Sequence, residues 1–233
     1  MSSAVTHPKK RRALSAELVL IDNFMKRSAI KREVDLQILG DWVSEGARVL
    51  DLGCGRGIFL EYLRQTKHIY GVGLDNQIEK VGGCVKRGVN VYQGDIETSL
   101  RQFSDGFFDW VLCSRTLQEL ARPQDIIRES LRVGKRFAVG FVNHGYWRNR
   151  VHMFRHGRRV VNEVFPEGWG ESRPLNPVTV GDFEDFCARE GLVITRRAYL
   201  RGDWHTPCTF LPSWLAGYVL YEITKSDEKK AAD

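Results

Sequence analysis

Apolar and polar positions form two alternating patterns along the middle of the chain. Short runs rich in Val, Ile, Leu and aromatic residues predict buried strands, and the segments between them, such as IFLEYLRQ, carry apolar residues at helical spacing. Strands that alternate with helices predict an α/β fold, in which a mostly parallel sheet has helices on both faces. The strands expected in this part of the chain are 47–53, 68–75, 89–95, 107–114 and 136–143.

The flanks of this region are less regular. Between about residues 17 and 44, apolar residues recur at helical spacing and predict one or two helices. Residues 144–178 are rich in Arg, Trp, Gly and Pro and show no clear period. Thr179 and Asp182 have the spacing of a capping box, and the helix that follows should end at Gly191. The last two of seven expected strands are 192–200 and 217–225.

Length and composition favour one domain. The chain has 233 residues, of which 42% are hydrophobic, enough for a single α/β domain with a full core. We expect a flexible basic arm over residues 1–15, one domain over 16–226 and a polar tail over 227–233.

The net charge of +6 is concentrated in the arm, because residues 9–12 (KKRR) supply four positive charges before the first acid. The remaining chain is close to neutral, so nucleic-acid binding is the less favoured interpretation of the charge.

The cellular location can be inferred from apolar runs and cysteines. No run reaches the roughly 18 apolar residues that span a bilayer, and Glu17 interrupts the apolar stretch near the N-terminus that could resemble a signal peptide. The five cysteines are widely spaced and include no C-x-x-C pair, which favours free thiols in a reducing compartment. We therefore expect a cytoplasmic protein without a metal site or a membrane segment.

The stretch VLDLGCGRGIFLEYL, residues 49–63, joins the end of a predicted strand to the start of a helix. Gly53, Gly55 and Gly57 allow a tight turn and a close approach of the backbone to a ligand. A dinucleotide site has the spacing G-x-G-x-x-G, whereas this turn is one residue shorter and follows Asp51. A carboxylate there repels a pyrophosphate but attracts a cationic ligand, which favours S-adenosylmethionine over a nicotinamide cofactor.

Two further acids end the next predicted strands. Asp75 is placed to accept hydrogen bonds from both ribose hydroxyls, and Asp95 to meet the adenine amine, with Ile96 against the ring. Three acids at three successive strand ends are hard to reconcile with an anionic cofactor. The residues expected to contact S-adenosylmethionine are Asp51, Gly53, Cys54, Gly55, Gly57, Asp75, Asn76, Asp95, Ile96 and Ser114.

This order of motifs resembles the class I S-adenosylmethionine-dependent methyltransferases, and several passages resemble one narrower family, the methionine biosynthesis protein MetW. The passages include RVLDLGCGRG, CVKRGVNVYQGDIE, FDWVLCSRTLQE, NHGYWRNR and TVGDFEDFCAREGLVI, and the resemblance covers about 45–225. It implies a Rossmann-like sheet of seven strands with the last antiparallel. It also implies a link to methionine biosynthesis beside a homoserine O-acyltransferase.

The chain departs from the family pattern on the expected substrate side. Arg115 stands where the family usually has Gln, and Glu119 stands at a position that is usually small. FVNHGYWR replaces a more typical FPNFGHWR, and GWGESRPLNP replaces another family segment at 168–177. These differences concern the acceptor or partner and leave the predicted cofactor residues unchanged.

Methyl transfer depends mainly on alignment of the acceptor, so the lack of an obvious base does not exclude it. The segment CSRTL, 113–117, lacks the Asp/Asn-Pro-Pro-aromatic motif of enzymes that methylate adenine or glutamine nitrogens. His144 could serve as a general base and Arg148 as a carboxylate clamp. The candidates for an acceptor site are Ser114, Arg115, Glu119, His144, Tyr146 and Arg148.

Each candidate also has a structural interpretation. His144 could be a structural loop residue, Trp147 and Trp169 could be packing residues, and Arg115 with Glu119 could form a helix-surface pair. The arginines of 148–159 could form a solvated face or bind RNA. Three functions therefore stay open: a cofactor-binding partner of an acyltransferase, a small-molecule methyltransferase and, less favoured, an RNA methyltransferase.

Overall fold

The computed structural model describes residues 33–161 and 176–226. The predicted N-terminal arm, the helical pattern before residue 33, Trp169 and the C-terminal tail lie outside these residues. The described elements are α2 (Val34–Trp42), β1 (Arg48–Leu52), α3 (Ile58–Lys67), β2 (Tyr70–Asp75), α4 (Ile78–Lys86), β3 (Asn90–Gln93), α5 (Ile96–Leu100), β4 (Phe108–Ser114), the 3-10 turn η1 (Leu117–Glu119), α6 (Pro123–Val133), β5 (Gly134–Val142), α7 (Trp147–His156), α8 (Val180–Arg189), β6 (Leu192–Leu200), α9 (Pro212–Leu215) and β7 (Tyr218–Lys225).

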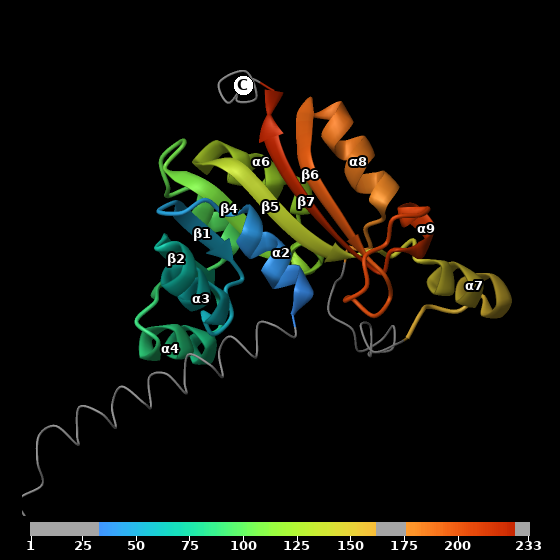
Figure 1. Cartoon of the computed structure of the whole chain (residues 1–233), viewed down its shortest axis with the longest axis horizontal. Helices are drawn as coiled ribbons and strands as arrows, with labels where there is room; N and C mark the ends of the chain where they lie inside the picture. Colours follow the sequence, from blue (N-terminus) through green and yellow to red (C-terminus); the bar gives the residue numbers. More distant parts are fainter. Residues whose placement is uncertain (1–32, 162–175, 227–233) are drawn as a thin grey trace, which may run out of the picture.

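All seven described strands belong to one twisted sheet with the order β3-β2-β1-β4-β5-β7-β6 (Figure 1). β1 lies at the centre of the parallel part, with Val49 beside Gly71 of β2 and Trp110 of β4. β7 runs antiparallel to both of its neighbours, β5 and β6. The predicted α/β class and the antiparallel last strand are confirmed.

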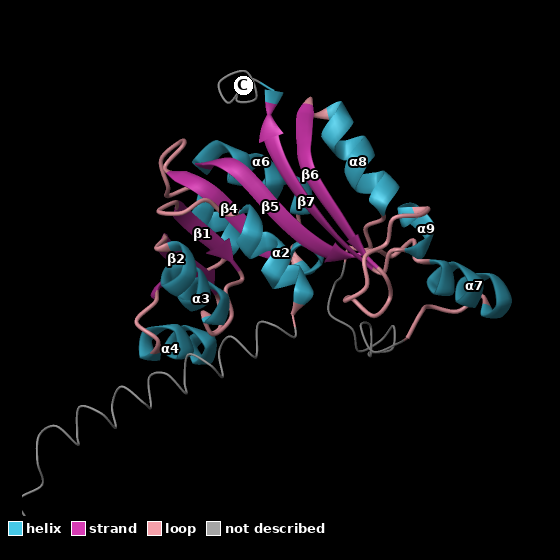
Figure 2. Cartoon of the chain, viewed as in Figure 1, coloured by secondary structure: helices cyan, strands magenta, loops and turns pink. Residues whose placement is uncertain are grey.

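Helices cover both faces of the sheet (Figure 2). On one face, α2, α3 and α4 contribute buried side chains such as Leu39, Leu63 and Cys84 to a core that includes Val49 of β1. On the other face, α5, α6 and α8 pack against a second core that includes Leu50 of β1. Neighbouring residues of β1 point to opposite faces, so the strand is buried on both sides, as a parallel sheet requires.

Local signals fix several helix ends. Pro123 occupies the first turn of α6, where its missing N–H costs no helical hydrogen bond. The capping box predicted before α8 is present: the Asp182 N–H donates to Thr179 Oγ1 at 3.1 Å, and the Thr179 N–H donates to Asp182 Oδ2 at 3.0 Å. Gly191, in the left-handed region, follows this helix.

Three of the described helices, the short α5 and α9 and the longer α7, were not predicted. α7 lies inside the segment 144–178, where the sequence showed no clear period. Its only buried residue is Asn149, so the few apolar side chains of this helix do not line a core, and they stand among many polar residues in the sequence. No helix within 33–161 or 176–226 is long and apolar enough to cross a membrane.

Candidate functional site

The glycine-rich turn links β1 to α3 at the carboxyl edge of the sheet. Gly53, Gly55 and Gly57 all have φ in the left-handed region, at +72°, +58° and +73°. The Gly53 N–H donates to the Leu74 carbonyl of β2 at 2.8 Å, which ties the turn to the neighbouring strand. A Cβ on Gly53 would lie 2.3 Å from Oγ1 of Thr116, so a larger residue fits neither the conformation nor the space.

At Gly57, the neighbour that excludes a larger side chain is Cys84 instead of Thr116. A Cβ at this position would lie 2.9 Å from Sγ of Cys84 in α4. Cys54 also contacts Cys84, with the two sulfur atoms 3.8 Å apart, and both side chains are buried free thiols. Burial raises the pKa of the Cys54 thiol, which holds it in the neutral form. Gly57 and Cys54 therefore let α4 pack closely under the turn.

Asp75 holds the turn from the end of β2. Its Oδ2 accepts a hydrogen bond from the Gly55 N–H at 3.0 Å, and its Oδ1 accepts one from the Gln77 N–H at 3.0 Å. Lys80 Nζ lies 3.8 Å from Oδ2. Each carboxylate oxygen has a second lone pair, so Asp75 can still accept hydrogen bonds from a ligand.

Asp51 is the most unusual acid at this edge. It lies within β1 and is 5% exposed. Burial, and then the negative charge of Asp75, raise the pKa of Asp51 to about 7. Among the described residues no Lys or Arg forms an ion pair with it. A buried carboxyl group of this kind favours a cationic ligand, which would supply the missing charge.

Two cavities flank the glycine turn, and they share Gly53, Ser114 and Arg115. The first has a volume of about 340 Å³ and the second about 180 Å³. Nine of the ten predicted cofactor residues line one of them, Gly57 being the exception. The first contains Asp75, Asn76, Asp95, Ile96 and Glu119; the second contains Asp51, Cys54 and Gly55.

Asp95 combines a structural role with its place in the larger of these two cavities. Its Oδ1 accepts a hydrogen bond from the Thr98 N–H at 3.1 Å and caps α5. Ile96 follows it and is buried. The cap fixes the direction of the Asp95 side chain, while leaving Oδ2 for another partner.

Arg115 corrects one interpretation of the sequence. It does not pair with Glu119 on a helix surface, because it has a φ of +59° and precedes the 3-10 turn η1. Its Nε and Nη2 instead donate to the two oxygens of buried Asp35 in α2, each at 2.8 Å. Nη2 also lies 2.6 Å from Oε2 of Glu33. Arg115 therefore fastens α2 over the point where the two cavities meet.

The other acceptor candidates lie apart from these cavities. His144, Tyr146 and Arg148 line neither of them. Burial, and then the charge of Arg159, lower the pKa of His144, which favours a neutral imidazole. Gly202 packs directly against the Tyr146 ring, since a Cβ there would lie 2.5 Å from the phenol oxygen.

Two other interpretations of the sequence are corrected: that the arginines of 148–159 form a solvated face, and that Trp147 is a packing residue. Arg148 lies over the ring of Trp147, which is 38% exposed and hence only partly packed. Arg150 is not simply solvated, because its Nε donates to the Gly145 carbonyl and its guanidinium lies 4.4 Å from the centre of the Trp214 ring.

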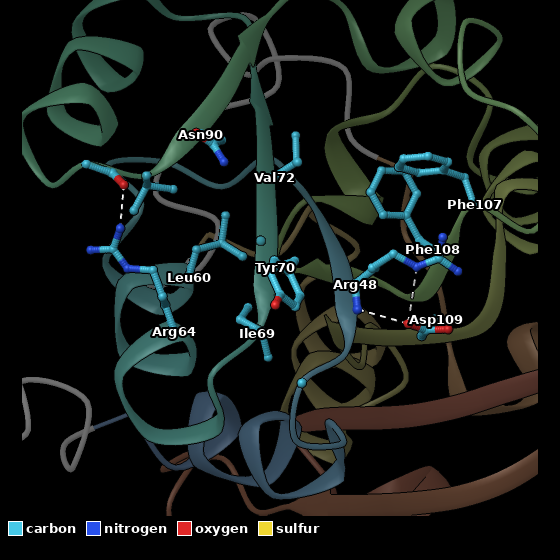
Figure 3. A pocket seen from close by; sticks show the side chains of 14 residues that line it. Arg48, Leu60, Arg64, Ile69, Tyr70, Val72, Asn90, Phe107, Phe108 and Asp109 are labelled. Carbon is cyan, nitrogen blue, oxygen red and sulfur yellow. Dashed lines mark hydrogen bonds and ion pairs between the residues drawn. The ribbon is translucent and has the colours of Figure 1, made fainter.

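A larger cavity, of about 780 Å³, lies at the opposite edge of the sheet (Figure 3). It is formed by the amino ends of β1, β2, β3 and β4, with Tyr70, Phe107 and Phe108 among its walls. Arg48 approaches Asp109 there, with its backbone N–H donating to Oδ2 at 2.9 Å. None of the predicted cofactor or acceptor residues lies in this cavity, so size alone does not locate the glycine-turn site.

Comparison with known proteins decides the family. The family described as "Methionine biosynthesis protein MetW" matches residues 33–223, which include every described strand up to the middle of β7. The chain belongs to the MetW family. A curated relative is the bifunctional methionine biosynthesis protein MetXA/MetW of Rhodopirellula baltica, 29% identical over 182 residues. The match covers 74% of this chain and 29% of the relative, so the chain spans less than a third of that protein.

Solved structures show the fold that this MetW protein shares with other proteins. An S-adenosylmethionine-dependent methyltransferase from Thermotoga maritima is 17% identical with a TM-score of 0.61, covering 88% of this chain and 96% of that one. The cyclase SpnF is 16% identical with a TM-score of 0.55, covering 86% and 80%. The same fold thus occurs in a methyltransferase and in a cyclase, and the fold alone does not show methyl transfer.

Several residues of this MetW protein's site gave no signal in the sequence. Lys80 approaches Asp75 one turn into α4, and Thr116 packs on Gly53. Leu36 of α2 lines the smaller of the two cavities beside Arg115. Asp35 stands 80 residues before its partner Arg115.

Proposed function

We propose that this MetW protein binds S-adenosylmethionine at the glycine turn and acts in methionine biosynthesis together with a homoserine O-acyltransferase. The observation that carries the cofactor assignment is Asp51, a buried carboxyl group with a pKa of about 7 and no matching cation among the described residues. S-adenosylmethionine carries an ammonium and a sulfonium group and no phosphate. Its positive charge would offset the cost of ionising Asp51.

In this proposal the two cavities would hold the two halves of the ligand. The larger of them, with Asp75, Asn76, Asp95 and Ile96, would hold the adenosine. Asp75 would accept the ribose hydroxyls through its remaining lone pairs, and Ile96 offers an apolar face to the ring. The smaller cavity, with Asp51, Cys54 and Gly55, would hold the amino-acid end. Gly53 and Ser114 line both cavities, so they would lie beside the sulfonium.

Calorimetry tests the cofactor assignment. Replacing Asp75 with Ala removes the acceptor for the ribose and for the Gly55 N–H, and we expect the affinity for S-adenosylmethionine to fall at least about twentyfold, or about 2 kcal/mol. Asp185→Ala, which removes an exposed acid from α8, should leave it unchanged. Unchanged affinity in the Asp75 variant, or no binding by the wild-type chain, would overturn the assignment.

The partner assignment rests on the relative that joins a MetXA part and a MetW part in one protein, and on the resemblance of this chain to the MetW family. Joining two parts in one chain keeps them at a high effective concentration, which suits parts that act together. The test mixes this protein with the homoserine O-acyltransferase of the same organism and measures complex formation and acyl transfer, with and without S-adenosylmethionine. We expect a complex and a changed rate. Independent migration and equal rates would contradict the assignment.

A small-molecule methyltransferase is the second candidate. Ser114, Arg115 and Glu119 line a cavity at the carboxyl end of β4, next to the proposed position of the methyl group. This candidate predicts S-adenosylhomocysteine production when the protein and S-adenosylmethionine are incubated with a metabolite extract. The hydrogen bonds from Arg115 to Asp35 hold the Arg115 side chain and α2 at the cavity where an acceptor would bind. Arg115→Gln would leave more room for the acceptor there, so it should raise the rate of methyl transfer rather than abolish it.

A further inference from the structure

Exposed apolar side chains gather on two neighbouring short elements at the carboxyl edge of the sheet. Figure 1 shows α7 projecting from the body of the protein beside α9. Phe154 is 91% exposed, Phe210 67% and Trp214 50%. We call this the α7–α9 surface; its residues are Trp147, Val151, Met153, Phe154, Phe210, Leu211 and Trp214.

The apolar residues of α7 have the spacing of a helix that packs one face against another surface. Trp147, Val151 and Phe154 stand at positions i, i+4 and i+7, which lie on one face of a helix. A helix of ten residues is marginal in water unless an apolar face packs against other residues. In α7 that face is exposed, and the only buried residue is Asn149. A partner that covers this face would stabilise the helix.

The charge around the face indicates the chemistry of the partner. α7 carries Arg148, Arg150 and Arg155 and no acidic residue. Arg158 follows within the exposed stretch after the helix. An apolar stripe bordered by arginines complements an apolar groove bordered by carboxylates.

The surface is attached firmly to the sheet. Buried Asn143, directly after β5, accepts a hydrogen bond from the Gly145 N–H at 3.0 Å and donates to the Ala216 carbonyl, just after α9, at 2.9 Å. The contact between Arg150 and Trp214 joins α7 to α9. The two helices therefore present one continuous surface, held at the same edge of the sheet as the glycine turn.

We propose that the α7–α9 surface docks into an acidic, apolar groove of the homoserine O-acyltransferase. The proposal rests on the partner assignment made above and adds where the partner binds. The fused relative favours a protein occupant, since its MetXA part is held beside its MetW part by the chain itself. An aromatic side chain as exposed as Phe154, on an apolar stripe, is the type of residue that anchors a protein interface.

The test measures the affinity of the full chain for the acyltransferase of the same organism. Phe154→Glu should weaken binding by at least about tenfold, and Arg155→Glu should weaken it less and reduce its salt dependence. The measurement is made at about 0.1 M and about 1 M salt, where the screening length falls from about 10 Å to about 3 Å. The matched control is Tyr70→Glu, which replaces a 74% exposed aromatic residue at the opposite edge and should have no effect.

The outcomes separate the two proposals. Binding by the wild-type chain that Phe154→Glu leaves unchanged would overturn the docking surface and keep the partner. No binding by the wild-type chain would overturn both. A second arm uses vesicles that contain phosphatidylglycerol: if Phe154→Glu abolishes binding to vesicles but not to the acyltransferase, the surface binds lipid and the proposal is wrong. Thermal unfolding of each variant checks that the exposed substitutions leave the fold intact.

Discussion

Three carboxylates, Asp51, Asp75 and Glu222, are buried in the central sheet. Asp51 and Glu222 differ in the charges that surround them. Glu222 in β7 has no exposed surface and lies between two arginines, with Arg136 Nη1 at 2.6 Å and Arg196 Nε at 3.2 Å. Asp51 in β1 has a similar burial, but its charged neighbour is Asp75, which is also negative. The β7 region supplies its own positive charge, whereas the described residues around Asp51 supply none. Under the proposed function, Glu222 is an acid that stabilises the fold and Asp51 is one that selects a ligand.

The largest expected effect is on stability at Asp51. In the folded protein the pKa of Asp51 is raised from 3.8 to about 7, so ionisation costs free energy that the unfolded chain does not pay. This cost develops as the pH rises from about 4 to about 7 and is constant above. Asp51→Asn should therefore increase the free energy of unfolding at pH 8, by up to about 4 kcal/mol. Urea unfolding at pH 8 and pH 4 measures it.

The same substitution should also lower the affinity for S-adenosylmethionine, because the amide carries no charge to match the ligand. A variant that is more stable at pH 8 and binds more weakly would place Asp51 among residues kept for function at the expense of stability. Loss of stability in Asp51→Asn at pH 8 would break the comparison.

The matching change at Glu222 should have the opposite sign. Glu222→Gln removes the partner of Arg136 and Arg196, and we expect the free energy of unfolding to fall by about 1–3 kcal/mol. The arginine side chains are partly exposed, at 36% and 47%, so water replaces part of the lost interaction. The measurement is urea unfolding at pH 8. Affinity for S-adenosylmethionine should not change, and a loss of affinity would mean that Glu222 also serves the ligand.

The pH dependence of ligand binding sharpens the contrast. Since the carboxylate form of Asp51 matches a cation, affinity for S-adenosylmethionine should fall as the pH drops through 7, by about tenfold between pH 8 and pH 6. Calorimetry at several pH values measures the trend. In Asp51→Asn the dependence over this range should disappear, and a dependence that persists there would assign the titration to another group.

Of the substitutions at cavity residues, the smallest expected effect on ligand affinity is at Arg115, the arginine that lines both cavities. Its charge is already matched by Asp35 and Glu33, which explains why it leaves Asp51 without a partner. Arg115→Gln should lower the free energy of unfolding by about 1–3 kcal/mol, because it leaves the buried carboxylate of Asp35 without its bidentate partner. It should change the affinity for S-adenosylmethionine by less than about threefold. A much larger loss of affinity would show that Arg115 supplies charge to the ligand site.

The parts of the fold and site that depend on short sequence patterns could be predicted. Runs of β-branched residues located all seven strands, and the Thr179–Asp182 pair located the start of α8. The glycine spacing and the acids at strand ends located the cavities, because parallel strands bring their carboxyl ends to one edge. In each case neighbouring residues carry the signal.

The parts that depend on distant partners could not be predicted. Arg115 and Asp35 are brought together by the packing of α2, and no local pattern marks the pair. Glu222 looks like an ordinary polar residue of a strand, until the sheet places Arg136 and Arg196 on either side. The acceptor candidates Tyr146 and His144 shared a sequence segment with Arg148, but not a cavity with Ser114.

The position of β7 between β5 and β6 constrains how the sheet assembles. β6 precedes β7 in the sequence, yet β7 is its only neighbour among the described strands. β6 can therefore join a ladder only by pairing with β7, either before or after β7 pairs with β5. During refolding, the amide protons of β6 should gain protection from hydrogen exchange no earlier than those of β7. In the native protein the edge formed by α8 and β6 should open first, with the β1–β4 centre still closed.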